Sequence, residues 1–170
     1  PDAPCFAHPS SMKSAIDKYC SRTGQGVPET AGDYCRVIFR SLALRYRQVI
    51  DILKGMAPFE INRLHVIGGG SQNGYLMQYA ANALDMQVVC GPVEGTALGN
   101  VLMQMKASGS VRTLEQMRRI SAESVNLVTY LPIDPDKWND EYERYLKIIS
   151  TRVCVNINYL TRKIKSYAFF

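Results

Sequence analysis

The feature that most constrains the fold of this chain is a run of three glycines between an apolar segment and a helical pattern. Residues 66–74 read VIGGGSQNG. The segment LHVIG at 64–68 is short, apolar and β-branched, as expected of a buried strand, and NGYLMQYAANAL at 73–84 has a helical pattern. Glycine loses more backbone freedom on folding than any other residue. We therefore expect that something at this strand-to-helix connection requires a bare backbone.

The rest of the chain extends this alternation of strands and helices. QVVCGP at 87–92 predicts a second buried strand, and further helices are predicted at 10–24, 30–55, 94–109, 114–121 and 136–149. Strands that alternate with helices favour an α/β fold, in which parallel strands are covered by helices. Two strands are few for such a sheet, so we expect part of an α/β domain.

Local signals define several of the predicted helix starts. Ser10 or Ser11 can cap the first helix, Thr30 with Asp33 forms a capping-box pattern, and Thr113 precedes Gln116 at the same spacing. The long second helix also carries four arginines, which we interpret as a solvated face: Arg36, Arg40, Arg45 and Arg47.

Two chemistries fit the glycine turn. A bare turn before a helix presents backbone N–H groups to a phosphate, with Ser71 and Asn73 at its mouth; alternatively, the glycines only permit a tight connection. The dinucleotide fingerprint requires glycine where Asn73 stands, and the P-loop requires a following lysine that is absent. Phosphate binding and a purely structural turn both remain open.

A second motif, CGPVEGTALGN at 90–100, follows the second predicted strand. Glu94 stands where a helix begins, so the simplest interpretation is a carboxylate that caps the helix and interacts with its dipole. A catalytic role is the alternative. Gly95, Ala97 and Gly99 are small enough for close helix packing.

Composition excludes several classes of protein. The 170 residues are 46% hydrophobic and 21% charged, which is typical of one globular domain. The net charge is +5, but residues 151–170 hold four basic residues and no acid, so the remainder carries only +1. We therefore expect no nucleic-acid partner. No apolar run reaches a membrane span, and the first ten residues lack a secretory signal pattern, so we expect a cytoplasmic protein without a membrane partner.

Cysteines and histidines give no metal or disulfide pattern. The five cysteines form no C-x-x-C pair, and we interpret them as reduced thiols that mostly lie in the core. His65 lies in a predicted buried strand and is interpreted as a core histidine. His8 is distant in sequence, so no zinc site is expected.

Together, these motifs resemble the C-terminal part of the FGGY carbohydrate kinases. The resemblance rests on RLHVIGGGSQNGYLMQYAANAL, VVCGPVEGTALGN and ETAGDYCRVIFRSLALRYR, and it extends to about residue 149. The sequence GPVE followed by TALGN is similar to that of the L-rhamnulokinase branch. Gly95 is a departure, because relatives usually have alanine there. Residues 151–170 resemble nothing in the family, although RVCVNINYL alternates like a strand.

The resemblance implies a partial RNase H-like domain of the actin and hexokinase type. Residues 1–149 would be an incomplete C-terminal nucleotide-binding domain, followed by a basic tail at 150–170. ATP with Mg²⁺ would bind the turn, with Gly69 as the main contact flanked by Gly68 and Gly70, and with Asn73 near the adenine.

It also implies that most of the catalytic machinery lies elsewhere. The family's catalytic aspartate and most of its sugar site precede this region, and no acid here matches that motif. Asp134 and Asp136 are interpreted as turn and cap residues. We expect an ATP-dependent kinase for an L-rhamnulose-like ketose whose isolated C-terminal part is inactive. The alternative is a non-catalytic fragment or a regulatory nucleotide-binding module.

Overall fold

The computed structural model describes residues 1–150. The basic tail and the predicted strand in RVCVNINYL lie outside the described residues. In chain order the elements are η1 (Pro4–Phe6), α1 (Met12–Arg22), α2 (Ala31–Met56), β1 (Arg63–Val66), η2 (Gly69–Gln72), α3 (Gly74–Leu84), β2 (Gln87–Cys90), α4 (Gly95–Ala107), α5 (Leu114–Glu123), β3 (Val128–Tyr130) and α6 (Pro135–Ser150).

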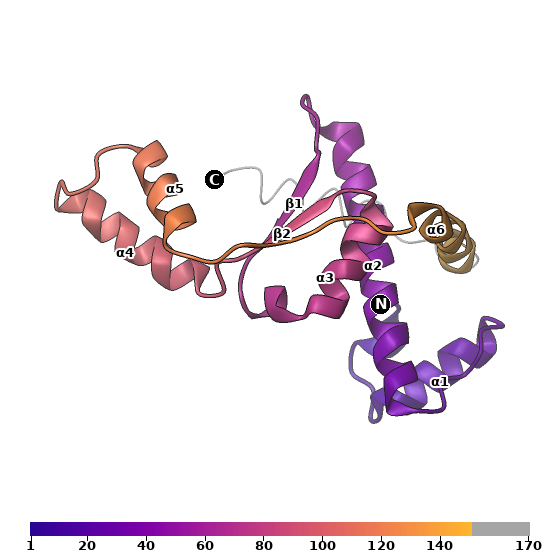
Figure 1. The fold of residues 1–170 in the computed structure, drawn as a ribbon. Helices are drawn as coiled ribbons and strands as arrows, with labels where there is room; N and C mark the ends of the chain where they lie inside the picture. The colour runs from indigo at the N-terminus through magenta and orange to yellow at the C-terminus, as the bar shows by residue number, and fades with distance from the viewer. Residues whose placement is uncertain (151–170) are drawn as a thin grey trace.

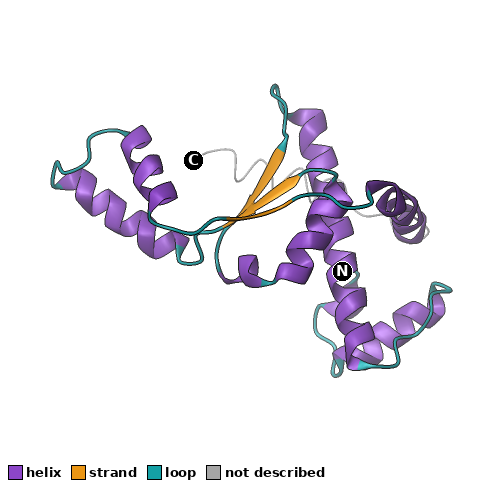
Figure 2. Ribbon diagram, viewed as in Figure 1, coloured by secondary structure: helices purple, strands orange, loops and turns teal. Residues whose placement is uncertain are grey.

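A mixed three-stranded sheet forms the centre of the molecule, in the order β1-β2-β3 (Figure 2). The pair β1 and β2 is parallel, with Val66 opposite Cys90. The pair β2 and β3 is antiparallel, with Cys90 opposite Val128. The predicted α/β fold and its parallel pair are confirmed. The sequence prediction lacked β3, because a three-residue strand gives too short a pattern to recognise.

One face of the sheet packs against α3, and the long helix α2 packs against α3 in turn (Figure 1). Side chains of β2 alternate, so Val88 and Cys90 face the helices. Small residues of α3 allow its backbone to lie close to these neighbours. The main core consists of Ile50, Leu76, Met77, Ala80, Ala81, Leu84, Met86, Val88 and Cys90.

The opposite face of the sheet is exposed at its two outer strands, whereas Val89 of the central strand is buried. His65 of β1 and Thr129 of β3 flank Val89 on this face, and both are exposed. The interpretation of β1 as a buried strand and of His65 as a core histidine is therefore wrong. Within residues 1–150 no layer covers this side, and burial cannot be deduced from a strand's own residues when the second layer is missing.

Two of the arginines of α2 anchor α6 instead of forming a solvated face. Arg40 donates from Nε to Oε2 of Glu141 at 3.0 Å, and its guanidinium lies 5.4 Å from the ring centre of Trp138. The guanidinium of Arg47 lies 4.3 Å from the ring centre of Tyr142. These contacts are electrostatic attractions between a cation and an aromatic face. Trp138 is itself buried against α2 and α3.

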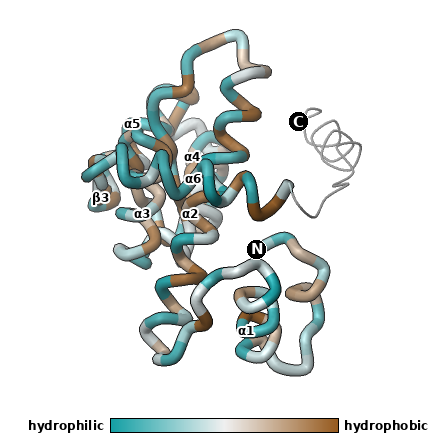
Figure 3. Tube along the Cα trace, turned by 90° about the vertical axis from the view of Figure 1, so that its right-hand side faces the viewer, coloured by the Kyte–Doolittle hydropathy of each residue, from teal (hydrophilic) through white to brown (hydrophobic). Residues whose placement is uncertain are grey.

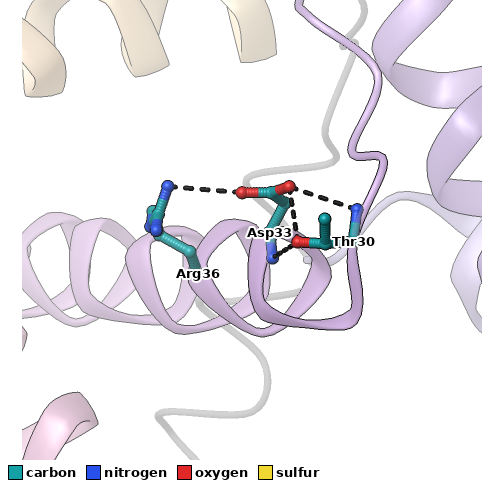
Figure 4. Close-up of polar contacts among 3 residues, drawn as sticks. All are labelled: Thr30, Asp33 and Arg36. Carbon is teal, nitrogen blue, oxygen red and sulfur yellow. Dashed lines mark hydrogen bonds and ion pairs between the residues drawn. The ribbon is translucent and has the colours of Figure 1, made fainter.

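The helix starts agree with the local signals. Ser11 accepts a hydrogen bond from the Ser14 amide, and Thr113 with Gln116 forms a complete capping box. Figure 4 shows the box at the start of α2, where Asp33 bonds back to Thr30 and also contacts Arg36. The hydrogen bonds from Thr30 lower the pKa of the Asp33 carboxyl. The coloured tube in Figure 3 alternates between hydrophilic and hydrophobic positions along the helices, as amphipathic helices require.

The helices α4 and α5 form an arm at one side of the sheet (Figure 1). The arm has a small core of its own, made by Leu102, Val111 and Met117 with Leu98, Met105 and Ile120 packed around them. Residues 91–94 lead into it and residues 124–127 lead out. The arm therefore packs as a separate unit, and two loop segments connect it to the sheet.

Four cysteines lie in the described part of the chain, and all four are free thiols. Cys20 and Cys90 are buried, whereas Cys5 and Cys35 are exposed. The expectation of mostly buried cysteines holds for only half of them. None of the helices within residues 1–150 is long and apolar enough to cross a membrane.

The outer edge of β1 generates the first prediction. No strand among residues 1–150 pairs with this edge, and unpaired edges are templates for association. We expect the chain to associate reversibly as its concentration rises, which sedimentation velocity over a concentration series measures. His65→Lys places a charge on the edge strand and should weaken association, whereas His8→Lys, far from the sheet, should not. A single monomeric species at every concentration would contradict the prediction.

Candidate functional site

The glycine turn connects β1 to α3 through a single turn of 3-10 helix. Gly68 has φ +85° and ψ −178°, a conformation that only glycine adopts without strain. Gly69 and Gly70 then begin η2, and the turn closes when the Ser71 amide donates to the Gly68 carbonyl at 3.0 Å. Backbone conformation therefore requires glycine at position 68, but not at the next two positions.

Packing does not require glycine at positions 69 and 70 either. A Cβ added to Gly69 or Gly70 would meet no atom within 4 Å, and both residues are exposed. Among the described residues, no acceptor bonds the N–H groups of Gly69 and Gly70. Open space beside unpaired N–H groups is the arrangement that an oxyanion needs.

Two polar side chains at the turn, those of Ser71 and Asn73, are engaged in the fold. Ser71 is buried and its hydroxyl donates to the Gly68 carbonyl at 2.7 Å, so Ser71 stabilises the turn. The Asn73 Oδ1 accepts from the Leu76 amide at 3.1 Å, which caps α3. Asn73 is therefore a helix cap, and contact with an adenine remains a prediction for it.

The structure brings the two sequence motifs together. The Gly68 amide donates to the Pro92 carbonyl at 3.0 Å, and the Gly91 amide donates to the Val66 carbonyl at 2.8 Å. These bonds continue the parallel pairing of β1 and β2 beyond the ends of both strands. The peptide bond between Gly91 and Pro92 is cis. Glycine turn and second motif thus form one continuous rim at the carboxyl ends of the strands.

A cavity of about 630 Å³ lies at this rim. Its lining comes from three segments: Ser71 and Gln72 of the glycine turn, residues 90–94 with Leu98, and residues 124–126 with Val128 and Tyr130. The third segment was missed by the sequence prediction, together with β3. The only signal for it was the β-branched and aromatic triplet VTY at 128–130.

A second cavity of about 590 Å³ lies beside the end of the turn and the start of α3. It is lined by Gln72, Asn73, Gly74, Tyr75, Gln78 and Tyr79. Asn73 therefore faces a different hollow from the one beside the second motif. Within residues 1–150, no group of three or more histidine, cysteine or acidic side chains is arranged to hold a metal ion.

Comparison with protein families decides the identity of this arrangement. Residues 1–108 match the C-terminal domain of the FGGY family of carbohydrate kinases, a stretch that includes both motifs. The chain belongs to the FGGY family. Its mixed sheet with a parallel pair is consistent with the actin-like ATPase fold of the FGGY C-terminal domain.

Curated relatives from bacteria are similar over most of the chain. The rhamnulokinase of Bacteroides thetaiotaomicron is 49% identical over 142 residues, which is 84% of this chain and 29% of that protein. The rhamnulokinase of Mannheimia succiniciproducens is 40% identical over 127 residues, 75% of this chain and 26% of the relative. That of Pectobacterium atrosepticum is 39% identical over 140 residues, 82% of this chain and 28% of the relative. The chain thus spans less than a third of these relatives.

The conformations of the three glycines generate a prediction about stability. Gly68→Ala should lower the free energy of unfolding by about 1–3 kcal/mol, because alanine is strained at the φ and ψ of Gly68. Gly70→Ala should change it by less than about 0.5 kcal/mol, because that position is neither strained nor crowded. Urea denaturation followed by circular dichroism measures both. Equal losses for the two variants would show that the turn needs all its glycines for folding.

Proposed function

We propose that this chain supplies the ATP-binding part of a sugar kinase that acts on an L-rhamnulose-like ketose. The observation that carries the proposal is the glycine turn, where Gly69 and Gly70 have open space and unpaired N–H groups that the fold does not use. FGGY kinases use ATP, and the names of the similar relatives support the choice of sugar.

In this proposal, the turn acts by binding and positioning. The N–H groups of Gly69 and Gly70 donate to phosphate oxygens of ATP, and the N-terminal end of α3 adds an attraction of about 0.3–1 kcal/mol for an anion. Phosphoryl transfer depends mainly on positioning and on stabilising charge, so holding the phosphates is a substantial contribution. Within residues 1–150 no group of three or more histidine, cysteine or acidic side chains could hold a metal ion, and we assign no step of the reaction to Mg²⁺ on this chain.

The competing proposal is a non-catalytic fragment or a regulatory nucleotide-binding module. It keeps the same turn and the same nucleotide, but it requires no sugar and no transfer. Both proposals agree that no acid in this sequence matches the family's catalytic aspartate. They differ in whether a catalytic domain works with this chain, which the sequence preceding Pro1 in the gene would answer.

The missing general base generates a prediction about activity. The 170-residue chain with Mg·ATP and L-rhamnulose should form no more ADP than a sample without sugar, because no acid in it matches the aspartate that deprotonates the sugar hydroxyl in the family. A coupled assay for ADP measures this. Sugar-dependent turnover by the chain alone would contradict the absence of a base.

The exposed glycines generate a prediction about affinity. Gly69→Val should weaken ATP binding at least tenfold, because its methyl groups would fill the space assigned to a phosphate. It should leave the melting temperature nearly unchanged, since a Cβ there meets no atom within 4 Å. Isothermal titration of the chain with ATP and thermal unfolding measure the two effects.

Gly26→Val is the matched control. Gly26 is exposed, has no atom within 4 Å of an added Cβ and does not have a positive φ, but it lies in the loop before α2. It should bind ATP like the wild type. If Gly69→Val keeps its ATP affinity within about twofold, a change of only about 0.4 kcal/mol, the turn does not hold the phosphates.

A further inference from the structure

Glu94 carries a carboxylate that the fold does not use. It stands at the N-cap of α4, yet its side chain makes no capping hydrogen bond. Glu94 is exposed, and among residues 1–150 its carboxylate has no hydrogen-bond or ion-pair partner. Glu94 thus stands at the helix start as expected, its interaction with the helix dipole stays a prediction, and its carboxylate remains available to a ligand.

The position of Glu94 is fixed beside the glycine turn. Two residues earlier, the Pro92 carbonyl accepts from the Gly68 amide at 3.0 Å. One residue later, a Cβ on Gly95 would lie 3.4 Å from Cδ1 of Ile67, the residue before the glycines. Glu94 lies between this hydrogen bond and the close approach of Gly95 to Ile67, and it lines the cavity of about 630 Å³ together with Ser71 and Gln72 of the turn.

The chemistry of this position restricts what Glu94 can bind. A carboxylate repels phosphate oxygens, so it cannot share the phosphate site directly. An ionised carboxylate only accepts hydrogen bonds, and the donors on a nucleotide near its phosphates are the ribose hydroxyls. The cavity has a size that is usual for small-molecule sites. Two hydroxyls of the lining already donate within the fold, that of Ser71 to the Gly68 carbonyl at 2.7 Å and that of Ser124 to the Ile120 carbonyl at 2.6 Å.

We propose that Glu94 accepts hydrogen bonds from the ribose hydroxyls of the nucleotide whose phosphates lie on the glycine turn, and so selects ribonucleotides. The inference rests on the proposed function, because it requires a nucleotide at the turn. Glu94 is then a specificity residue supplied by the second motif, in the lining of the cavity that Ser71 and Gln72 also line. Carboxylates recognise ribose hydroxyls in the same way in dinucleotide-binding folds.

The test compares ATP with 2′,3′-dideoxy-ATP as titrants of the full 170-residue chain. The wild type should bind ATP about tenfold more tightly than the dideoxy nucleotide. Glu94→Ala should weaken ATP binding to the level of the dideoxy nucleotide and leave the affinity for the dideoxy nucleotide within about twofold. Glu94→Gln, which keeps an acceptor oxygen, should retain part of the preference.

Glu115→Ala is the matched control. Glu115 is an exposed acid in the first turn of α5, so its removal has a comparable effect on a helix dipole without touching the cavity. It should keep the wild-type preference for ATP. Each titration is repeated in EDTA without Mg²⁺, because a carboxylate can also act on phosphates through a bound Mg²⁺ ion.

The outcomes distinguish a failure of nucleotide binding from a failure of the ribose contact alone. A wild type that binds neither nucleotide contradicts the proposed function and this inference together. A wild type that binds both nucleotides equally overturns the ribose contact alone and leaves nucleotide binding in place. An effect of Glu94→Ala that is equal for both nucleotides and disappears in EDTA would assign Glu94 to Mg²⁺ and also overturn the ribose contact. A preference that persists in EDTA and is lost only in the Glu94 variants supports it.

Discussion

The parallel pairing of β1 with β2 is the interaction on which the candidate site depends. Two backbone hydrogen bonds extend it past the strand ends, from Gly68 to Pro92 and from Gly91 to Val66. Parallel strands end at the same edge of a sheet, so the loops that follow them meet there. Without this register, the glycine turn and Glu94 would be two unrelated surface loops.

The pairing is itself supported by dense packing behind the central strand. Val88 and Met77 are almost completely inaccessible, and Ala80, Ala81 and Ala83 of α3 are fully buried. Small side chains let α3 lie close to β2 and α2, so the start of α3 is fixed relative to the strand ends. The polar network around Asn82 adds to this, because its Oδ1 accepts from Gln78 and from the Ile133 amide. Packing in the core thus fixes the position of the glycine turn, which lies at the start of α3.

The features that were predicted correctly from the sequence depend on residues close together in the chain. Caps such as Thr30 with Asp33 involve neighbouring residues, and the strand–glycine–helix order follows from short patterns. Long-range features were predicted poorly. The exposure of His65 depends on the absence of a covering layer within residues 1–150, the pairing of Arg40 with Glu141 joins residues far apart in the chain, and β3 is recognisable only as the partner of β2. Within the site, the sequence supplied the glycines, but the wall formed by residues 124–130 required the structure.

The arm formed by α4 and α5 begins and ends at register partners, since Cys90 pairs with Val128. Topologically, the arm is an excursion: the chain leaves the sheet at the end of β2 and returns beside it at the start of β3. The entropy of closing such an excursion changes slowly with its length. Related chains can therefore lengthen, shorten or replace this segment at little cost to the sheet. The excursion also carries one wall of the cavity, so evolution can alter the ligand's surroundings on that side while the glycine turn and its supporting core stay the same.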